Sequence, residues 1–348
     1  MLYLLLTADS FKESFLEELG RISEYSIIDE RNNLFIAEIA EGRERQLDRS
    51  AFIYSYFPIY NQGRLDKKSY IKSVYRCIEG LEINRQKGTT LECFDINCKS
   101  GYSAKDIEVQ VGTALEHDGY NIDIARPSVL AYAVLLNSVC YAGYVSLDGI
   151  RREFIDTFRF YKHKEISRAE FKLVEAFDTF RPKAPRIAID LGAAPGGWSL
   201  CLARSGAAVV AIDSAELEYG KIINAGIDAV AAKNPHGVRL NMERLRQGTI
   251  VHLKCGFQKA EKCLEGGIAD MLTIDINSGG IASSDAVLRY SRFMKKGAYL
   301  IMTVKCIMRS VPKYMREVEG ILGGKFRILQ WKVLPHNRQE ITLFARKK

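Results

Sequence analysis

Two ionisable residues stand at the ends of runs that have the composition of buried strands. Lys305 directly follows the apolar residues 299–304, and Asp275 follows residues 272–274. Such positions are unusual for solvated surface charges, and the carboxyl ends of strands in a doubly wound sheet form its ligand-binding edge. A lysine there can accept a proton if burial or a nearby cation lowers the pKa of its ammonium group. The pair therefore predicts a site for acid–base chemistry.

A glycine-rich turn between an apolar strand and a helix is the strongest local signal. Residues 188–199 read Ala-Ile-Asp-Leu-Gly-Ala-Ala-Pro-Gly-Gly-Trp-Ser, with the helix beginning near Trp198. The glycines let the backbone turn sharply and approach a ligand closely, although their spacing fits neither Gly-x-Gly-x-x-Gly nor a P-loop. Asp213 follows about twenty residues later, where an acidic residue can bind a ribose diol. A purely structural turn is the alternative interpretation.

The second half of the chain alternates between strand-like and helical stretches from about residue 167 onward. This alternation predicts a parallel, doubly wound α/β sheet whose carboxyl edge carries Asp275 and Lys305. The expected strands are residues 187–191, 207–212, 248–253, 271–276, 298–304 and 341–345.

Residues 190–199 resemble the S-adenosylmethionine loop of the FtsJ-like (RrmJ-type) ribose 2′-O-methyltransferases, which have a Rossmann-like class I SAM-dependent methyltransferase domain. The resemblance implies S-adenosyl-L-methionine as the cofactor and Asp213 as the acid that binds its ribose. The other implied cofactor contacts are Asp190, Gly192, Ala193, Pro195, Gly197, Trp198, Cys255, Gly256, Phe257 and Asp275.

The same family carries a catalytic Lys-Asp-Lys-Glu tetrad. Residues 167–177 resemble the family helix that supplies the first lysine, here Lys172, and Asp275, Lys305 and Glu340 follow in the family order. The resemblance implies that Lys305 is the general base for in-line methyl transfer and that Asp275 is its closest partner. Lys172 would supply a second positive charge beside Lys305, and Glu340 would position Lys172 or the ribose. No metal is implied.

Two departures from the family pattern concern the ligand loops. Many relatives carry an acid that accepts a hydrogen bond from the adenine amino group, and Cys255 stands in its place here. Adenine recognition is therefore expected to use backbone groups or to be weaker. Relatives also have a proline just after the catalytic aspartate, whereas Ile276 and Asn277 follow Asp275, so we expect a more mobile substrate loop.

The first half of the chain mixes short strands and helices, which predicts α+β structure. Residues 61–146 resemble a THUMP domain, an RNA-binding module, and residues 1–60 would be the ferredoxin-like domain that often precedes it. Residues 147–166 are expected to form a linker and residues 167–348 the methyltransferase domain. A generic oligomerisation module is the alternative for residues 61–146. With both halves, the chain resembles the RlmM-type large-subunit rRNA cytidine 2′-O-methyltransferases, most closely over residues 167–180, 303–318 and 334–346.

Charge is distributed unevenly along the 348 residues. The net charge is +8, but residues 289–348 hold fifteen Lys or Arg against three Glu, a local net of +12, and the preceding 288 residues sum to −4. This concentration around Lys305 and Glu340 favours a polyanionic substrate such as RNA. The candidate phosphate contacts are Arg168, Arg309, Lys313 and Arg338, with Arg316, Lys325, Arg327 and Lys332 as further candidates.

Composition excludes several protein classes. With 47% hydrophobic and 26% charged residues, the chain has the composition of a globular protein and not of a disordered or fibrous one. The sequence contains no run of about eighteen apolar residues, so we expect no membrane-spanning helix. The eight cysteines form no C-x-x-C pair and the five histidines do not cluster with them, so we expect reduced thiols, no zinc site and a cytoplasmic protein.

Three functions remain open from the sequence. The leading one is ribose 2′-O-methylation of rRNA. The second is the same reaction on tRNA, because THUMP domains also occur in tRNA-modifying enzymes. The third is a non-catalytic RNA-binding or ribosome-assembly factor whose cofactor pocket has decayed, a reading that the intact tetrad disfavours.

Overall fold

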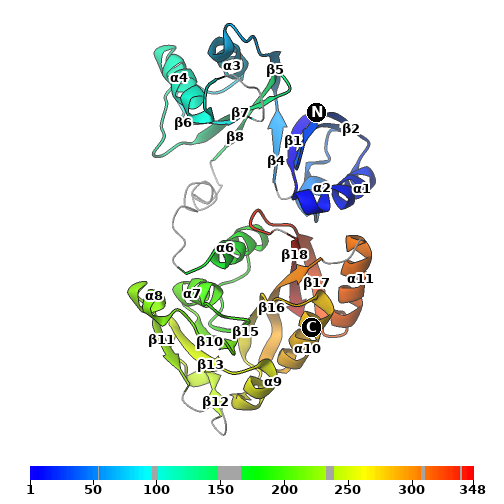
Figure 1. The fold of residues 1–348 in the computed structure, drawn as a ribbon, viewed down its shortest axis with the longest axis vertical. Coiled ribbons are helices and arrows are strands. Elements are labelled where there is room, and N and C mark those ends of the chain that lie inside the picture. The colour runs from blue at the N-terminus through cyan, green and yellow to red at the C-terminus, as the bar shows by residue number, and fades with distance from the viewer. Residues whose placement is uncertain (54, 96–100, 148–165, 233–238, 307–309, 338) are drawn as a thin grey trace. The chain divides into compact units, whose positions relative to one another are not determined.

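The chain folds into two compact units, Met1–Asp156 and Thr157–Lys348. The computed structural model (Figure 1) describes residues 1–53, 55–95, 101–147, 166–232, 239–306, 310–337 and 339–348. The linker expected at residues 147–166 lies almost entirely outside the described residues.

The first unit begins with an antiparallel sheet whose strands lie in the order β2-β3-β1-β4. Helix α1 packs on this sheet through Phe15 and Leu19, which are four residues apart and so lie on one face of the helix. The element order β-α-β-β-α-β is that of a ferredoxin-like arrangement. The elements are β1 (Leu2–Leu6), α1 (Lys12–Ile22), β2 (Tyr25–Arg31), β3 (Leu34–Ile39), α2 (Glu44–Arg49) and β4 (Ser55–Ile59).

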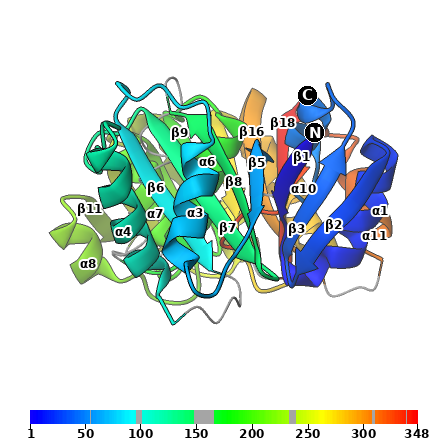
Figure 2. The same cartoon turned by 90° about the horizontal axis from the view of Figure 1, so that it is seen from above.

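A second sheet of this unit has the strand order β5-β8-β7-β6 and is covered by α3 and α4 (Figure 2). Helix α4 begins at a capping box, in which the Ser103 Oγ accepts from the Asp106 amide and the Asp106 carboxylate accepts from the Ser103 amide. Asn137 and Ser138 form the turn of a hairpin, since β7 and β8 pair antiparallel across these two residues. The elements are β5 (Asn61–Arg64), α3 (Tyr70–Glu79), β6 (Thr89–Asp95), α4 (Ala104–His117), β7 (Val129–Leu136) and β8 (Val139–Ser146).

The two sheets of the first unit share one hydrophobic cluster. Leu4 and Ile36 from the first sheet pack in it with Val134 and Leu136 from the second. Because this apolar surface is buried between the sheets, each sheet depends on the other for its stability. Residues 1–147 therefore behave structurally as one body in their described part.

An eight-stranded sheet forms the centre of the second unit, in the order β11-β13-β10-β9-β15-β16-β18-β17 among the described residues. All five residues of β9 are buried, as expected for a strand covered on both faces. The parallel, doubly wound sheet that we expected is confirmed except at one strand, because β18 runs antiparallel to both β16 and β17. The strands are β9 (Ile187–Leu191), β10 (Ala208–Asp213), β11 (Asp228–Ala231), β13 (Thr249–Lys254), β15 (Ala269–Ile274), β16 (Met294–Lys305), β17 (Phe326–Lys332) and β18 (Glu340–Lys347).

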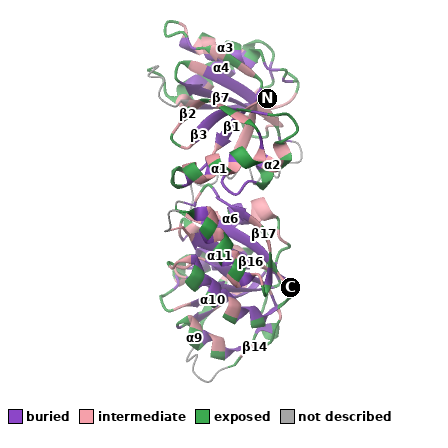
Figure 3. Cartoon of the chain, turned by 90° about the vertical axis from the view of Figure 1, so that its right-hand side faces the viewer, coloured by how far each residue is buried: buried purple, intermediate pink, exposed green. Residues whose placement is uncertain are grey.

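Helices cover both faces of this sheet (Figures 1 and 3). Residues of α6, α7 and α8 share a core with alternate residues of the strands, such as Ile301. Gly280 of α10 lies against Val304 and Val318, which places α10 and α11 on the other face. Among the described residues, no helix is both long and apolar enough to cross a membrane. The helices are α6 (Ala169–Phe180), α7 (Gly197–Arg204), α8 (Tyr219–Asn224), α9 (Phe257–Ala260), α10 (Gly280–Tyr290) and α11 (Val311–Leu322), and β12 (Leu240–Asn241) pairs with β14 (Leu264–Glu265).

Candidate active site

Four side chains from distant parts of the chain meet at the carboxyl edge of the eight-stranded sheet. Lys172 lies on α6, Asp275 directly follows β15, Lys305 ends β16 and Glu340 begins β18. The pairing of β16 with β18 places Lys305 opposite Glu340. The reversed direction of β18 is therefore what brings the first residue of that strand to the edge where the other strands end.

These four residues form a chain of ion pairs. The Lys172 Nζ lies 2.5 Å from the Glu340 Oε2 and 3.4 Å from the Asp275 Oδ2, and the Lys305 Nζ lies 3.8 Å from the Glu340 Oε1. The side chains of Lys172 and Glu340 are 16% and 12% exposed, whereas that of Lys305 is 28% exposed. Lys305 is thus the member of the cluster that a substrate reaches most easily.

Asp275 contacts a different lysine from the one we expected. We predicted that Asp275 would be the closest partner of Lys305, but its Oδ2 faces Lys172 and its Oδ1 accepts a hydrogen bond from the Thr303 Oγ1 at 2.5 Å. Lys305 instead donates to the Asn277 side-chain oxygen. Thr303 lies two residues before Lys305 on the same face of β16, so its hydroxyl fixes the rotamer of Asp275 and turns the second oxygen towards α6.

The ammonium group of Lys172 is stabilised in its charged form. Burial opposes the charge, but the carboxylates of Asp275 and Glu340 outweigh burial and raise the pKa of Lys172 above its usual value. Lys172 therefore stays protonated at neutral pH and can act as a fixed cation. Burial also raises the pKa of the neighbouring Cys306 thiol to about 12, which excludes a thiolate nucleophile beside Lys305 at neutral pH.

Helix α6 is tied to the segment that precedes Glu340. Both oxygens of the buried Glu175 carboxylate contact His336, one through the His336 amide at 3.0 Å and one through the ring Nδ1 at 2.6 Å. The Phe171 ring packs on the same imidazole, with 4.9 Å between centroids. Because Lys172 lies one turn from Glu175, this clamp holds Lys172 in reach of Glu340.

Thr303, Asn277, Glu175 and His336 are the residues that sequence reasoning missed at this site. One signal was present for Thr303, a polar residue in an otherwise apolar strand and two positions from Lys305. The spacing of Glu175 from Lys172 also places the two on neighbouring faces of one helix. His336 carried no such signal, because its partner is 161 residues away in the chain.

The glycine-rich turn has the close packing that its composition predicts. Gly192 has φ +77°, and a Cβ there would lie 2.5 Å from the Ile276 Cγ2 and 3.0 Å from the Asp275 carbonyl oxygen. A Cβ at Gly197 would lie 2.8 Å from the Ser167 Oγ. Glycine at these two positions therefore lets the turn lie against the catalytic strand end and against the start of α6. Ala193 and Pro195 lie in this turn, and the Ala194–Pro195 peptide is cis.

Two loop residues that we expected to contact the cofactor are turned into the core. The Asp190 carboxylate is buried and accepts hydrogen bonds from the Ser199 Oγ at 2.6 Å and the Thr273 Oγ1 at 2.8 Å. The buried Trp198 indole donates to the Ala169 carbonyl oxygen at 2.6 Å. These side chains support the turn from the side of the core. A contact between Trp198 and the cofactor would therefore have to use the Trp198 backbone.

Burial raises the pKa of Asp190 to about 7. The folded protein therefore holds a proton that the unfolded chain releases above about pH 4, and the free energy of unfolding should fall as pH rises from about 4 to 7. We expect Asp190→Asn to remove this fall, so the variant gains stability relative to the wild type as pH rises from about 4 to 7. Chemical denaturation across that range measures it, with exposed Asp285→Asn as the control. A difference that does not change with pH would contradict the expectation.

Asp213 closes the other side of the turn. Its Oδ2 accepts from the Ala194 amide at 3.1 Å and its Oδ1 from the Ala215 amide at 2.8 Å. The buried His252 ring contacts the Asp213 carbonyl oxygen through Nε2 at 3.2 Å and the Tyr219 hydroxyl through Nδ1 at 2.6 Å. The carboxylate thus ends β10 in a fixed position, with lone pairs left to accept a diol.

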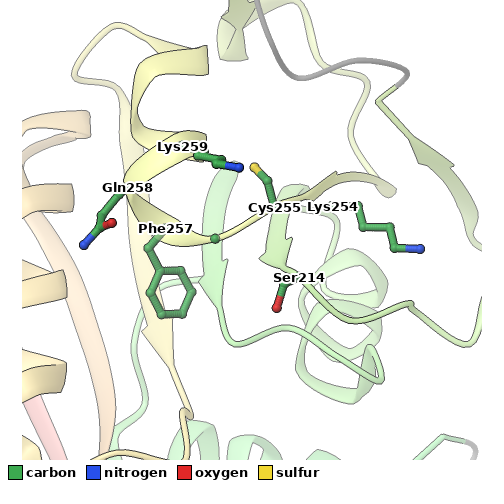
Figure 4. A pocket seen from close by; sticks show the side chains of 7 residues that line it. Ser214, Lys254, Cys255, Phe257, Gln258 and Lys259 are labelled. Atoms are coloured by element: carbon green, nitrogen blue, oxygen red, sulfur yellow. The ribbon is translucent and has the colours of Figure 1, made fainter.

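An open pocket of about 560 Å³ is lined by the residue that directly follows Asp213 in the chain (Figure 4). Ser214 lines it from the end of β10, and the loop after β13 contributes Cys255, Gly256 and Phe257. Burial raises the pKa of the Cys255 thiol, so this side chain is a neutral group at physiological pH. The pocket therefore has the size and the mixed apolar and polar lining of a small-molecule site. Its remaining lining residues are Lys254, Gln258 and Lys259.

The candidate phosphate contacts are distributed unequally over the structure. Arg168 is exposed at the start of α6, and Lys313 is exposed in the first turn of α11. Arg309 and Arg338 lie outside the described residues. Lys332 is buried, so the expectation that it contacts RNA is wrong.

Comparisons with known proteins find one family match within the second unit. Residues 166–306 match the model of the FtsJ-like methyltransferase family. The chain is 26% identical over 193 residues to a protein of Laribacter hongkongensis named ribosomal RNA large subunit methyltransferase M, covering 51% of this chain and 47% of that protein. It is 24% identical over 195 residues to an uncharacterized protein of Methanocaldococcus jannaschii, covering 54% and 48%. The chain spans about half the length of the curated relatives it matches.

Among solved structures, TrmN from Thermus thermophilus aligns with the whole chain and the whole of that protein, at 14% identity and a TM-score of 0.41. The second unit has a Rossmann-like methyltransferase fold, and residues 166–306 are the part of it that matches the FtsJ-like methyltransferase family. This match ends one residue after Lys305, so α11, β17 and β18 with Glu340 lie beyond the matched region.

Proposed function

We propose that this chain, with its FtsJ-like methyltransferase domain, is an S-adenosylmethionine-dependent methyltransferase that modifies a ribose 2′-hydroxyl of large-subunit rRNA. The observation that carries the proposal is the convergence of Lys172, Asp275, Lys305 and Glu340 at the carboxyl edge of the sheet, next to the glycine-rich turn. A cluster of two lysines and two carboxylates at this edge suits the activation of a hydroxyl group.

The geometry supports different roles for the two lysines. Lys172 is held between two carboxylates and its pKa is raised, so it serves as a fixed cation. Lys305 is more exposed and is the lysine that accepts the proton of the ribose hydroxyl at its Nζ. Asn277 and Glu340 orient Lys305 from two sides, and Asp275 acts on the site through Lys172. Much of the rate comes from holding the hydroxyl in line with the methyl group.

The residues of the turn and the pocket fit S-adenosylmethionine, which supplies an electrophilic methyl group on a sulfonium sulfur. Gly192 lets the turn lie directly against the Asp275 backbone, which brings the turn beside the catalytic strand end. Asp213 would accept the ribose hydroxyls, and Ser214 and Phe257 would flank the adenine in the adjoining pocket. Held by these residues, the cofactor would supply its methyl group at the edge that carries Lys305.

The choice of rRNA draws on the similarity to the large-subunit enzyme of Laribacter hongkongensis and on the charge of the second unit. Residues 157–348 carry a net charge of +14, whereas residues 1–156 carry −6. A basic catalytic unit attracts polyanionic RNA, and the first unit, with its THUMP-like second sheet, would select the RNA by shape.

The substrate class is tested by incubating the full chain with methyl-labelled cofactor and separate rRNA and tRNA fractions from cells that lack this protein. We expect label in the large-subunit rRNA fraction alone. Label confined to tRNA would replace the rRNA assignment by the tRNA alternative. No transfer to either fraction, with cofactor binding intact, would favour a non-catalytic RNA-binding or assembly role.

Cys255 provides a test of how the cofactor base is held. A carboxylate at this position would accept a charge-assisted hydrogen bond from the adenine amino group, which the buried thiol does not provide. We expect Cys255→Asp to tighten cofactor binding by about three- to tenfold in calorimetry, while Cys255→Ser changes it by less than about twofold. Weaker binding by Cys255→Asp would mean that the adenine lies elsewhere.

A further inference from the structure

Much of the basic charge in the second unit lies at the amino edge of its sheet, opposite the catalytic residues. Strands β9, β15, β16 and β17 begin at this edge, and the reversed strand β18 ends there. Five chain segments meet at this edge, and together they contain nine basic residues and one acidic residue, Asp270. The segments are residues 182–187, 269–271, 294–298, 325–328 and 345–348. We name these nine residues the basic edge: Lys183, Arg186, Lys295, Lys296, Lys325, Arg327, Arg346, Lys347 and Lys348.

Contacts within the structure show that these segments adjoin. Asp270 joins the segment before β9 to the start of β16, because its Oδ2 accepts from the Arg186 and Ile187 amides at 3.0 Å while its Oδ1 pairs with Lys295. On β18, Arg346 lies opposite both Tyr299 of β16 and Arg327 of β17. The five segments therefore form one continuous edge of the sheet (Figure 1).

Two further observations show how crowded the positive charge is. The Lys348 amide donates to the Lys325 carbonyl oxygen at 3.0 Å, which brings two lysines together at the ends of β17 and β18. The pKa of Lys347 is lowered by its burial and further by the charge of Lys325. Since Asp270 is already paired with Lys295, it does not neutralise the other eight charges.

Such a concentration of like charge on one edge destabilises the fold unless a counter-charge binds there. Exposed Lys and Arg side chains that adjoin over several strands match the repeated charges of a nucleic-acid backbone. Neighbouring strands are about 4.8 Å apart, so five strands give a row of about 19 Å, enough for several phosphates. A single small anion would use only part of this row.

The catalytic and basic edges are well separated. Tyr299 and Lys305 stand six residues apart on one strand, which corresponds to about 20 Å along β16. The phosphates that flank a ribose at Lys305 therefore cannot also contact Arg346 or Arg327. The expectation that the basic excess surrounds Lys305 is wrong for Lys325 and Arg327, which lie at the opposite end of the sheet.

We propose that the basic edge is a second RNA-binding surface, which holds the backbone of the substrate RNA at a point remote from the methylated nucleotide. This inference rests on the proposed function, since it takes RNA as the ligand. It implies that the preferred substrate is a folded RNA large enough to reach both edges of the domain. A short oligonucleotide that carries only the target nucleotide would lose the contacts made at the basic edge.

The test compares two variants of the full chain that lose the same charge. The edge variant carries Lys296→Gln, Lys325→Gln, Arg327→Gln and Lys348→Gln, all at exposed positions. The control variant carries Arg21→Gln, Arg43→Gln, Arg45→Gln and Arg49→Gln, also exposed, in residues 1–60, where eleven acidic residues outnumber six basic ones. Binding of a labelled RNA hairpin of arbitrary sequence is measured by anisotropy over a range of salt concentrations.

We expect the edge variant to bind the hairpin about tenfold more weakly than the control variant, with a salt-dependence slope shallower by about two or three. In methyl transfer to the rRNA fraction it should raise KM and leave kcat unchanged, since the lost contacts do not involve the reacting atoms. Equal hairpin affinity and equal slopes for both variants would overturn the inference. If both variants bind the hairpin equally and transfer to rRNA is normal, the inference fails while the proposed function still stands.

If the edge variant misfolds, the inference can be tested on the wild-type protein instead. Acetylation of exposed lysines, mapped by mass spectrometry, should show Lys296 and Lys325 protected when the hairpin is bound and Lys12 unprotected. Full reactivity of Lys296 and Lys325 in the bound complex would contradict the inference, whichever partner is then found for this edge.

Discussion

Replacing Lys305 with alanine should lower the rate of methyl transfer by about 10³-fold, because the ribose hydroxyl then lacks the group that accepts its proton. Lys305→Arg should be equally inactive, since a guanidinium keeps the charge but cannot give up its proton in a protein. Single-turnover transfer to the rRNA fraction measures both variants. Hairpin affinity should stay within about twofold of the wild type, because one cation among many is lost.

Exposed Lys221→Ala, in the same domain, is the matched control for Lys305→Ala and should be fully active. Substantial activity in Lys305→Arg would show that this position contributes charge only. Activity in both Lys305 variants would assign the base to another group, and the pKa of Lys172 argues against that lysine.

Replacing Lys172 with methionine should lower kcat by about 10²- to 10³-fold, by removing the cation that lies between Asp275 and Glu340. Without it, two partly buried carboxylates face each other and Glu340 no longer has a fixed position for orienting Lys305. The role of Lys172 requires only charge, so Lys172→Arg should keep a large part of the activity. The readout is kcat with cofactor and RNA at saturation.

The contrast between the two lysines is the discriminating result. Arginine should substitute for Lys172 and fail at Lys305. The raised pKa of Lys172 means that its charge, and the stability that this charge gives, is present below the usual lysine pKa and is lost only as pH rises above it. The rate profile between about pH 6 and 9 should therefore have the same shape in the wild type and in Lys172→Arg. Lys172→Arg as inactive as Lys172→Met would contradict the fixed-cation role.

Some parts of the fold could be predicted because local patterns determine them. Strands such as β9 and β15 are short and mostly apolar, which follows from burial on both faces. Strands β2 and β17 were missed, because each lies at a sheet edge and mixes polar with apolar residues, several of them exposed. Gly20 is a plausible stop signal in the sequence, but α1 continues through it to Ile22, because glycine weakens a helix without ending it.

The sequence predicts which residues form the candidate site but not which of them contact one another. That Asp275 and Lys305 share an edge follows from each ending a strand of one sheet. Which lysine faces Asp275 depends on the Thr303 hydrogen bond and on the position of α6, and both are tertiary features. The direction of β18 could not be predicted either, because the alternation of strands and helices does not determine which way the last strand runs. This direction places the basic residues at the end of β18 far from Lys305.

The chemical position of the methyl group distinguishes ribose methylation from base methylation. RNA modified by the wild-type chain is digested to nucleosides and analysed by mass spectrometry, with the Lys305→Ala variant in parallel. The proposed mechanism predicts that the wild type adds its methyl group to the ribose, as a 2′-O-methyl nucleoside, and that this product is absent with Lys305→Ala. A methyl group on a base, or a 2′-O-methyl product that persists in Lys305→Ala, would contradict it.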